Sequence, residues 1–385
     1  MSLRDDALAY HKLKRGKIGI SLKRPVTSRR DLSLAYTPGV AEVSKAIAKN
    51  KDLARDYTNK GNSVAIVSDG TATLGLGNVG PEAALPVMEG KAALFKAFAG
   101  VDAYPLCIDE TDPKKIIALV KALAPSFAGI NLEDISAPRC FEIERTLKRE
   151  LDIPVFHDDQ HGAAVVILAA LINALRVVGK DHREVRVVLN GAGAAGIATA
   201  HLLLAYGIRH LVVIDKHGVL HSRQKGMHAY QRELAKLTKP KVRGGLKEAL
   251  VDADVFIGLS VGNILTKEMV AAMAPRAIVF AAANPTPEIH PDKARAAGAA
   301  VIATGRSDFP NQINNAIVFP GLFRGLLDAR ATEISTDTLL CIAGCLAKLI
   351  AKPTASKIIP SIFDKRTVKT VAHTVPQVGV CNCLY

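Results

Sequence analysis

The sequence predicts an α/β protein with two domains: an N-terminal α/β domain and a Rossmann-like, doubly wound dinucleotide-binding domain. Three observations lead to this prediction. The chain has 385 residues, which is enough for two or three domains at roughly 150 residues each. Short runs rich in β-branched residues alternate with helical segments, as in parallel sheets covered by helices. A glycine-rich turn at Gly191 follows one of these runs and opens a helix, which is typical of dinucleotide-binding sheets.

The first half of the chain is predicted to form helices and then a small parallel sheet. Over residues 4–53 the helical segments are interrupted by glycine and proline. A buried strand over 63–68 stops at Asp69, where a turn begins, and a glycine-rich loop over 75–80 leads into a helix over 87–98. The further elements predicted in this half are strands over 103–108 and 128–132 and an amphipathic helix over 113–123.

The second half is predicted to form a new α/β unit after a helix over 163–178. Its predicted elements are strands over 185–189, 211–214, 255–258, 277–282 and 301–303, with a helix over 194–206 after the first strand. We place the junction near 155–162, which gives domains 1–157 and 158–385. Helical segments resume near residue 321, and these C-terminal helices, about 321–374, could pack back on the first domain.

The composition excludes a disordered, fibrous or disulfide-stapled protein. Hydrophobic residues make up 49% of the chain and charged residues 22%, as in ordinary globular proteins. The six cysteines are few for this length and show no C-x-x-C spacing. Neither disulfides nor a structural zinc site is therefore expected.

The charge of the chain suits a small anionic ligand. The 50 Lys and Arg against 36 Asp and Glu give a net charge of +14. Nucleic acid is not expected as a partner, because the basic residues are scattered, aromatic residues make up only 5% and tryptophan is absent. Residues 4–6 are charged where a secretory signal needs an apolar run, and the uncharged stretch 163–172 is shorter than the roughly 18 residues of a membrane span. We expect a cytoplasmic protein with no membrane partner.

The turn from Gly191 to Gly196 has the G-x-G-x-x-G spacing of a dinucleotide-binding loop, and its members are Gly191, Ala192, Gly193, Ala194, Ala195 and Gly196. The glycines allow a tight turn and close backbone approach, and the helix that follows offers free N–H groups to a pyrophosphate. Asp215 ends the next strand, 24 residues after Gly191, and could accept hydrogen bonds from a ribose. A plain glycine turn is the alternative, but the order of strand, turn, helix and acid favours a dinucleotide.

The sequence leaves the choice between NAD and NADP open. Asp215 would repel the 2′-phosphate of NADP and favours NAD. Basic residues that could neutralise such a phosphate follow closely, namely Lys216, His217, Arg223 and Lys225. The same residues could equally belong to a solvated loop.

Two pairs of adjacent acids follow two of the predicted strands. Glu133 and Asp134 come after one strand, and Asp158 and Asp159 come after another. The carboxyl ends of parallel strands can meet at one edge of a sheet, where α/β proteins bind ligands. Oxygen ligands without sulfur select Mg²⁺ or Mn²⁺ over zinc. Adjacent acids in loops are more often helix caps and turn formers, so the residues alone leave both interpretations open.

Lys91 and Tyr36 are candidates for proton transfer. Lys91 lies in a mostly apolar helical stretch, where burial would lower its pKa and let it act as a base. The alternative is a lysine that extends to solvent. Tyr36 precedes the rigid turn Thr37-Pro38-Gly39 and could present its hydroxyl as a proton donor, although a lone tyrosine is more often a packing residue.

Eight segments in order along the chain resemble the short bacterial-type malic enzymes. Together they extend over about residues 10 to 370. The segments are YTPGVA from Tyr36, SDGTATLGLGNVGP from Ser68, MEGKAALFK from Met88, NLEDISAPRCFEIE from Asn131, FHDDQHG from Phe156, NGAGAAGIA from Asn190, AAANPTPEI from Ala281 and GRSDFPNQINNAIVFPG from Gly305. Any one of these strings is weak evidence, but eight in the family's order are specific.

The resemblance implies the oxidative decarboxylation of (S)-malate to pyruvate and CO₂, with reduction of NAD⁺ or NADP⁺ and a requirement for Mg²⁺ or Mn²⁺. It also implies a homodimer. The residues that match the family's site are Glu133, Asp134 and Asp159 as metal ligands, Asp158 as a neighbouring active-site acid, Lys91 as general base, Tyr36 as general acid, and Asn284 and Asn315 as contacts of the substrate carboxylate or the nicotinamide end.

The chain departs from the larger eukaryotic members of that family at one position that matters. Those enzymes hold the substrate carboxylate with an arginine after the DG pair, where this chain has Ala72. The group that anchors the carboxylate here is therefore not identified by the sequence. Two other functions are compatible with the residues: a malolactic-type lyase that retains its dinucleotide and releases lactate, and a non-enzymatic nucleotide-sensing protein.

Overall fold

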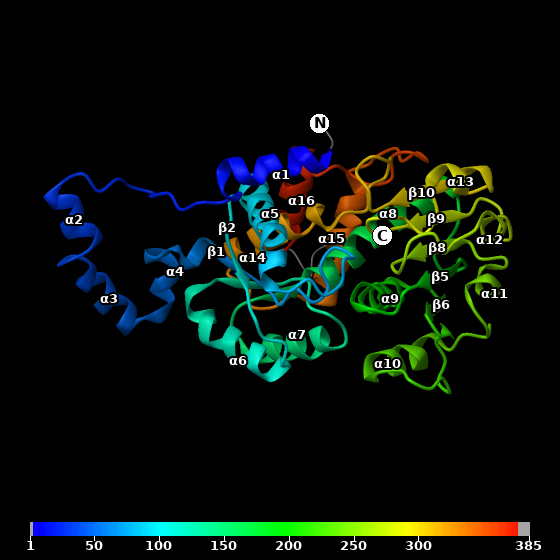
Figure 1. Cartoon of the computed structure of the whole chain (residues 1–385), viewed down its shortest axis with the longest axis horizontal. Coiled ribbons are helices and arrows are strands. Elements are labelled where there is room, and N and C mark those ends of the chain that lie inside the picture. Colours follow the sequence, from blue (N-terminus) through cyan, green and yellow to red (C-terminus); the bar gives the residue numbers. More distant parts are fainter. Residues whose placement is uncertain (1–2, 376–385) are drawn as a thin grey trace.

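Two β-sheets, each covered by helices, form the body of the protein and lie side by side along its long axis (Figure 1). The structure is a computed structural model that describes residues 3–375. The first sheet has the strand order β2-β1-β3-β4, and the second has the order β10-β9-β8-β5-β6-β7. The predicted α/β fold with two domains is confirmed.

The strands are short and mostly buried on both faces, as expected for parallel strands between helices. Strand β1, SVAIVS, is buried throughout, and its β-branched residues suit an enclosed strand. The strands of the first sheet are β1 Ser63–Ser68, β2 Asp102–Cys107, β3 Gly129–Leu132 and β4 Val155–His157. Those of the second sheet are β5 Arg186–Asn190, β6 His210–Asp215, β7 Gly218–Val219, β8 Val255–Gly258, β9 Ile278–Ala281 and β10 Val301–Thr304.

Helices precede, connect and follow the strands. The helices up to the end of the first sheet are α1 Leu3–Lys14, α2 Arg29–Ala35, α3 Val40–Lys49, α4 Ala54–Tyr57, α5 Pro81–Ala99, α6 Pro113–Leu123 and α7 Arg139–Glu150. The later helices are α8 Asp158–Val178, α9 Ala194–Tyr206, α10 Ala229–Thr238, α11 Leu246–Leu250, α12 Lys267–Ala271, α13 Pro291–Ala296, α14 Phe319–Asp328, α15 Thr336–Lys348 and α16 Lys365–Thr374. Short 3₁₀ turns are η1 Lys51–Leu53, η2 Asn59–Asn62, η3 Ala124–Ser126 and η4 Asn315–Ile317.

Two helices begin earlier than the sequence predicted. The predicted start of α5 followed Pro86, but the helix begins at Pro81, where a proline loses no hydrogen bond, and it continues through Pro86. Helix α8 begins at Asp158 rather than at residue 163, because two acids in its first turn interact favourably with the helix dipole. Asp158 and Asp159 therefore lie on a rigid helix and not in a loop.

The second sheet has the doubly wound arrangement of a dinucleotide-binding domain. Its chain starts at β5, proceeds outward through β6, and then crosses to β8, β9 and β10 on the other side of β5. Ligands bind in such sheets at the carboxyl ends of the strands where the order reverses, here between β5 and β8. The two-residue strand β7 runs antiparallel to β6, where a further parallel strand would normally stand.

The C-terminal helices contact both halves of the body. In the first half, the ring of Phe323 on α14 packs against those of Phe95 on α5 and Phe156 on β4, at centroid distances of 5.4 and 6.1 Å. In the second half, the buried side chain of Asn173 on α8 donates to the carbonyls of Ala347 and Ile358, each at 2.9 Å. One cluster of buried side chains includes residues of both sheets, so the boundary at 157/158 stays a prediction.

Helix α8 is long and apolar enough to cross a membrane by length and composition alone. It extends beyond the uncharged stretch 163–172 on which the sequence-based expectation rested. However, 72% of its apolar window is buried inside the protein. A helix that is apolar on all sides is also the pattern of a helix packed in a protein core.

The segment 18–58, which we call the N-terminal arm, projects away from the body (Figure 1). It comprises an extended stretch followed by α2, α3 and α4. None of its side chains is buried. At its two ends the arm is anchored by contacts such as that of the Arg330 guanidinium with the Asp56 carboxylate.

We predict that the aromatic contact between α14 and the first sheet stabilises the fold. Phe323→Ala should lower the free energy of unfolding by about 3–5 kcal/mol, because the side chain is fully buried. Phe363→Ala is the matched control: this ring is 81% exposed, and its loss should cost less than about 1 kcal/mol. Urea denaturation measures both values, and equal losses would contradict the assignment.

Candidate active site

A cavity of about 940 Å³ lies where the two sheets meet. Its walls include the segments that follow β1, β3 and β4 of the first sheet and β5, β8, β9 and β10 of the second. This volume lies within the usual range for small-molecule sites. The predicted site residues that line the cavity are Lys91, Glu133, Asp134, Asp159, Gly193, Ala194, Ala195, Asn284 and Asn315.

Three carboxylates meet on the first-sheet side of the cavity. Glu133 and Asp134 follow β3, and Asp159 lies in the first turn of α8, directly after the neighbouring parallel strand β4. One oxygen from each of the three lies within 4.8 Å of the others. The Asp134 backbone has a φ of +54°, and its N–H donates to Asp159 Oδ2 at 2.8 Å. This hydrogen bond fixes the turn against α8.

Burial and the charges of neighbouring acids raise the pKa values of Asp134 and Glu133. Burial, followed by the charge of Asp159, raises the pKa of Asp134 to about 7. Burial also raises the pKa of Glu133 well above its ordinary value, although Lys91 opposes the change. Asp134 Oδ2 is buried without a hydrogen-bond partner in the described part of the chain. A hard divalent cation would satisfy this oxygen and offset the negative charge, so the residues fit Mg²⁺ or Mn²⁺.

Lys91 is buried beside the three carboxylates. Its Nζ lies 2.6 Å from Glu133 Oε2 and also forms an ion pair with Asp158 Oδ2. The ring of Phe319 lies 4.3 Å from Nζ. Burial alone would lower the pKa of Lys91, as the sequence analysis expected, but the charges of the neighbouring acids, Asp158 first, outweigh it and raise the pKa above its ordinary value. That expectation was therefore wrong for the protein without a metal.

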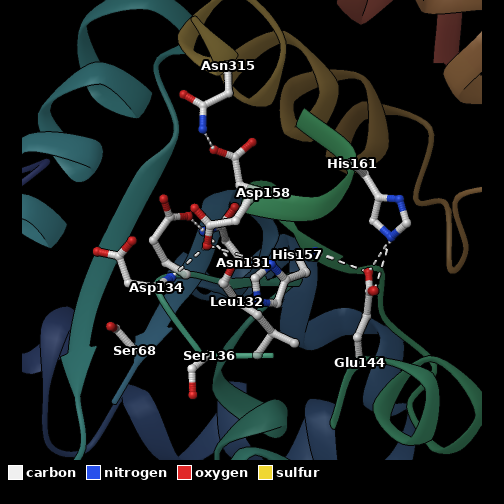
Figure 2. A network of polar contacts seen from close by, with 12 residues as sticks. Ser68, Asn131, Leu132, Asp134, Ser136, Glu144, His157, Asp158, His161 and Asn315 are labelled. Carbon is white, nitrogen blue, oxygen red and sulfur yellow. Dashed lines mark hydrogen bonds and ion pairs between the residues drawn. The ribbon is translucent and has the colours of Figure 1, made fainter. Parts of the chain in front are cut away.

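Asp158 turns back from α8 to hold both Lys91 and Asn315, and Figure 2 shows its contact with the amide of Asn315. The side chain is fully buried. Gly162, one turn further along α8, makes this position possible, because a Cβ there would lie 2.0 Å from Asp158 Oδ1. Asp158 thus connects the lysine of α5 to the start of η4.

Glu144 lies beside the start of α8, where it contacts His161 (Figure 2), and it was not among the residues predicted from the sequence. The His157 backbone N–H donates to Glu144 Oε1 at 3.2 Å, and the Lys148 ammonium and the His161 ring lie 2.8 and 2.9 Å from the same oxygen. Burial would raise the pKa of Glu144, but His161 and Lys148 lower it far below its ordinary value. The available signal was a glutamate on the apolar stripe of α7, between Phe141 and Leu147.

The glycine turn after β5 has the shape needed to hold a pyrophosphate. Gly191 has a φ of +118°, and a Cβ at that position would lie 2.4 Å from the carbonyl oxygen of Leu259. A Cβ at Gly196 would collide with the carbonyl of Gly191, whereas one at Gly193 would point into open space. No side chain caps the N-terminus of α9, so its first N–H groups are available to a phosphate.

Asp215 stands at the end of β6, beside the glycine turn. The Gly191 N–H donates to the carbonyl of Ile214 at 2.8 Å, which holds the two strand ends together. The Asp215 carboxylate accepts hydrogen bonds from the His217 backbone N–H at 2.7 Å and from the Gln224 side-chain amide at 3.2 Å. Both donors are neutral, so neither brings a positive charge to the Asp215 carboxylate.

Comparison with protein families agrees with this site. A family model described as malic enzyme, N-terminal domain, matches residues 15–116 and 110–148, and one described as malic enzyme, NAD binding domain, matches residues 160–380. The chain belongs to the malic enzyme family.

Relatives within the malic enzyme family cover nearly all of the chain. The bifunctional malic/malolactic enzyme of Bacillus subtilis is 54% identical over 99% of this chain and 94% of its own length. The NADP-dependent malic enzyme of Halomonas elongata is 46% identical over 98% of this chain and 93% of its own length. The crystal structure of an NAD-dependent malic enzyme from Thermotoga maritima superposes with a TM-score of 0.94 at 48% identity, covering 96% of this chain and 99% of that one.

Tyr36 does not line the cavity, and the other predicted site residues that do not line it are Asp158, Gly191, Gly196 and Asp215. Tyr36 caps the C-terminus of α2 on the N-terminal arm, and its side chain is 66% exposed. The malic enzyme cavity of this chain is lined by other segments. Within one described chain, Tyr36 and Lys91 are therefore not brought together.

Ala72 lines the cavity, so no side chain at that position can bind a substrate carboxylate. In the described part of this malic enzyme, no arginine lines the cavity, and its lysines there are Lys17 and Lys91. The Lys17 ammonium donates a hydrogen bond to the carbonyl oxygen of Pro86 at 2.7 Å, and both residues line the cavity. The amides of Asn284 and Asn315 are the remaining neutral donors among the predicted substrate contacts.

We predict that Asp134 destabilises the metal-free protein at neutral pH. Its pKa in the folded protein, about 7, lies above the ordinary 3.8, so stability is lost as the pH rises from about 4 through 7. Metal-free Asp134→Asn should therefore be more stable than metal-free wild type at pH 8, by at most about 4 kcal/mol, and the difference should vanish toward pH 4.

Thermal melting of the chelated proteins at both pH values measures this difference. Asp152→Asn, which removes an exposed acid just before β4, is the control and should show no such difference. Added Mn²⁺ should raise the melting temperature of wild type more than that of Asp134→Asn. A wild type that is more stable than Asp134→Asn at pH 8 without metal would contradict the assignment.

Proposed function

We propose that this protein catalyses the oxidative decarboxylation of (S)-malate to pyruvate and CO₂, with reduction of a nicotinamide dinucleotide. The supporting observation is the single cavity that joins a buried lysine, three converging carboxylates and a dinucleotide-binding turn. Membership of the malic enzyme family supports the same reaction. A nucleotide-sensing protein would need the turn but neither the lysine nor the acids.

The residues proposed to hold the metal are Glu133, Asp134 and Asp159. When bound, a divalent cation would act as a Lewis acid on the substrate's C2 oxygen and stabilise the electrons left behind by CO₂. The same positive charge would offset the carboxylates that raise the pKa of Lys91. Lys91 would then be able to exist as the free amine that a base requires.

We assign to Lys91 the removal of the proton from the C2 hydroxyl of malate. Hydride leaves C2 for the nicotinamide only as this proton departs, so a base must stand beside that oxygen. Asp158 holds Nζ in place through its ion pair, and Phe319 covers the other side of the ammonium group. Both contacts restrict the lysine to one position at the cavity wall and keep water away from it.

We assign the binding of the pyrophosphate to the residues from Gly191 to Gly196. We assign the binding of the substrate carboxylate or of the nicotinamide amide to Asn284 and Asn315. After CO₂ leaves, the enolate must gain a proton at C3 to become pyruvate. By the family resemblance we assign this proton to the hydroxyl of a tyrosine matching Tyr36, which then recovers a proton from Lys91, although Tyr36 of the same chain does not line the cavity. The proton removed from the C2 hydroxyl is thereby balanced by the proton added at C3, and the products are pyruvate, CO₂ and the reduced dinucleotide.

We propose NAD⁺ as the preferred dinucleotide. Asp215, at the end of β6 beside the glycine turn, is assigned the ribose 2′-hydroxyl, and the two groups that donate hydrogen bonds to its carboxylate are neutral. A 2′-phosphate at this position would meet that charge. The printed names of relatives include both an NAD-dependent enzyme, from Geobacillus stearothermophilus, and an NADP-dependent one, so the names alone do not decide.

A second activity, the conversion of malate to lactate, is favoured by one observation. The relative from Bacillus subtilis, 54% identical over almost the whole chain, is named as bifunctional malic/malolactic. The same lysine, acids and dinucleotide would serve both reactions if the reduced dinucleotide stayed bound and returned its hydride to pyruvate. The two reactions differ in whether free reduced dinucleotide accumulates.

We predict that malate and Mn²⁺ will produce absorbance at 340 nm faster with NAD⁺ than with NADP⁺. Initial rates at saturating malate measure this preference, and an assay of pyruvate and lactate separates the two activities. If lactate forms without a change in absorbance at 340 nm, the protein acts as a lyase, and the proposed oxidative reaction is wrong. Activity that is unaffected by thorough chelation would contradict the metal site.

We predict that Lys91→Ala will lower kcat by about two to four decades, as loss of a general base does, with little change in dinucleotide affinity. Lys96→Ala is the matched control, because Lys96 lies on the same helix, 64% of its side chain is exposed, and it pairs with Asp102 away from the cavity. Its kcat should equal that of wild type. Near-normal turnover by Lys91→Ala would refute the assigned role.

A further inference from the structure

The cavity has an excess of negative charge before any substrate enters. Four carboxylates surround the ammonium of Lys91, namely those of Glu133, Asp134, Asp158 and Asp159. With all four ionised, a bound divalent cation would still leave this group with one negative charge in excess. Malate at neutral pH brings two more negative charges, and like charges repel at short range. A further cation of the protein at the cavity would therefore lower the cost of bringing malate in.

Lys17 supplies such a cation. It lines the cavity, whereas no arginine of the described chain does so. Its ammonium donates to the neutral carbonyl of Pro86 at 2.7 Å and, within residues 3–375, takes part in no ion pair. An ammonium has three N–H donors, so donors remain for a ligand. The ammonium of Lys91, in contrast, is already paired with two acids.

The backbone of Lys17 is fixed by Glu89 of α5. The Lys17 N–H donates to Glu89 Oε2 at 3.1 Å. Gly16, just before it, has a φ of +105°, and a Cβ at that position would lie 2.9 Å from Glu89 Oε1. Glu89 thus holds the turn that follows α1, and it binds the main chain of Lys17 rather than its ammonium.

The Lys17 ammonium lies on the turn of α5 that leads to Lys91. Its contact with Pro86 is one turn before Lys91 on the helix, and a Cβ at Gly90 would lie 3.9 Å from Lys17 Nζ. Pro86, Gly90 and Lys91 all line the cavity. Lys17 therefore adds a second ammonium along the face of α5 that carries the proposed base.

The chemistry of the reaction decides which carboxylate of malate a fixed cation can hold. The C4 carboxylate leaves as neutral CO₂ and its negative charge moves to the enolate, so a cation bound to it would oppose its departure. The C1 carboxylate, next to the hydroxyl carbon, keeps its charge from malate to pyruvate. A cation bound to C1 stabilises substrate and transition state alike, which strengthens binding without slowing the chemical step.

We propose that Lys17 binds the C1 carboxylate of malate, in the role that the chain cannot give to Ala72. The inference rests on the proposed function for the identity of the substrate. Lys17 and Lys91 then have separate tasks, since the first holds the substrate and the second moves its proton. Loss of the first should change KM, and loss of the second should change kcat.

Lys17→Met tests this division, because methionine keeps an unbranched apolar side chain and removes the charge. The KM for malate should rise about tenfold to hundredfold, as for loss of a hydrogen bond to a charged group. The kcat should stay within about twofold of wild type, and the KM for the dinucleotide should not change. Lys17→Arg, which keeps the positive charge, should recover most of the lost affinity.

Lys14→Met is the matched control. Lys14 lies in the last turn of α1, is exposed and does not line the cavity. The substitution removes the same charge from the neighbourhood of the site, and the KM for malate should equal that of wild type. An equal rise in both variants would show a general effect of net charge and would overturn the assignment to Lys17.

Two fragments of malate test which carboxylate is held. Lactate combines the hydroxyl with the carboxylate that is retained, and 3-hydroxypropionate combines it with the carboxylate that leaves. Measured as competitive inhibitors of malate turnover, lactate should be weakened in Lys17→Met by the same factor as malate, and 3-hydroxypropionate should be unaffected. Weakening of 3-hydroxypropionate with no change for lactate would overturn the proposal.

Calorimetry gives the affinity for malate without turnover. Malate is titrated into the Mn²⁺-loaded protein with the reduced dinucleotide present, because the reduced form cannot accept a hydride. The dissociation constant should rise in Lys17→Met by the factor seen in KM, and equal values for wild type and variant would overturn the proposal. Failure of the proposed function is distinguishable, because wild type itself would then not turn over malate.

Discussion

The ammonium group of Lys91 is buried against Glu133 and Asp158, while Asp134 and Asp159 lie close by, so that four carboxylates share one lysine. In a low-dielectric interior this imbalance is costly, and protein groups relieve it only in part. Asp134 Oδ2, which is buried without a hydrogen-bond partner among the described residues, is an oxygen that no protein group stabilises. The same excess of negative charge therefore favours the binding of a divalent cation and destabilises the folded protein when no cation is bound.

The fold brings these charges together through the ends of parallel strands. Strands β3 and β4 are neighbours, so the acids that follow them meet at one edge of the first sheet. The crossing point between β5 and β8 opens at the corresponding edge of the second sheet, which places the glycine turn opposite the acids. Glu144 and Gly162 contribute from outside the cavity, one by holding the start of α8 and the other by leaving room for Asp158.

Local signals predicted much of the fold, and long-range placement accounts for what they missed. Strand β1 and helix α9 have the bounds that the sequence indicated, because the turns at their ends are set by nearby glycines. The raised pKa of Lys91 depends on acids far along the chain, and the His161 partner of Glu144 likewise comes from another helix. The position of Tyr36 relative to Lys91 depends on how a long arm is directed, which no local pattern encodes.

The location of the cavity at the junction of two sheets has a mechanical consequence. The acids and the lysine lie beside the first sheet, on α5, on α8 and after β3, and the dinucleotide turn lies at the second sheet, so a small hinge rotation between the two sheets would separate hydride donor from hydride acceptor. An opening wide enough to exchange the coenzyme would then separate the catalytic residues from the dinucleotide. Reaction intermediates would stay bound for as long as the two sheets remained in the closed position.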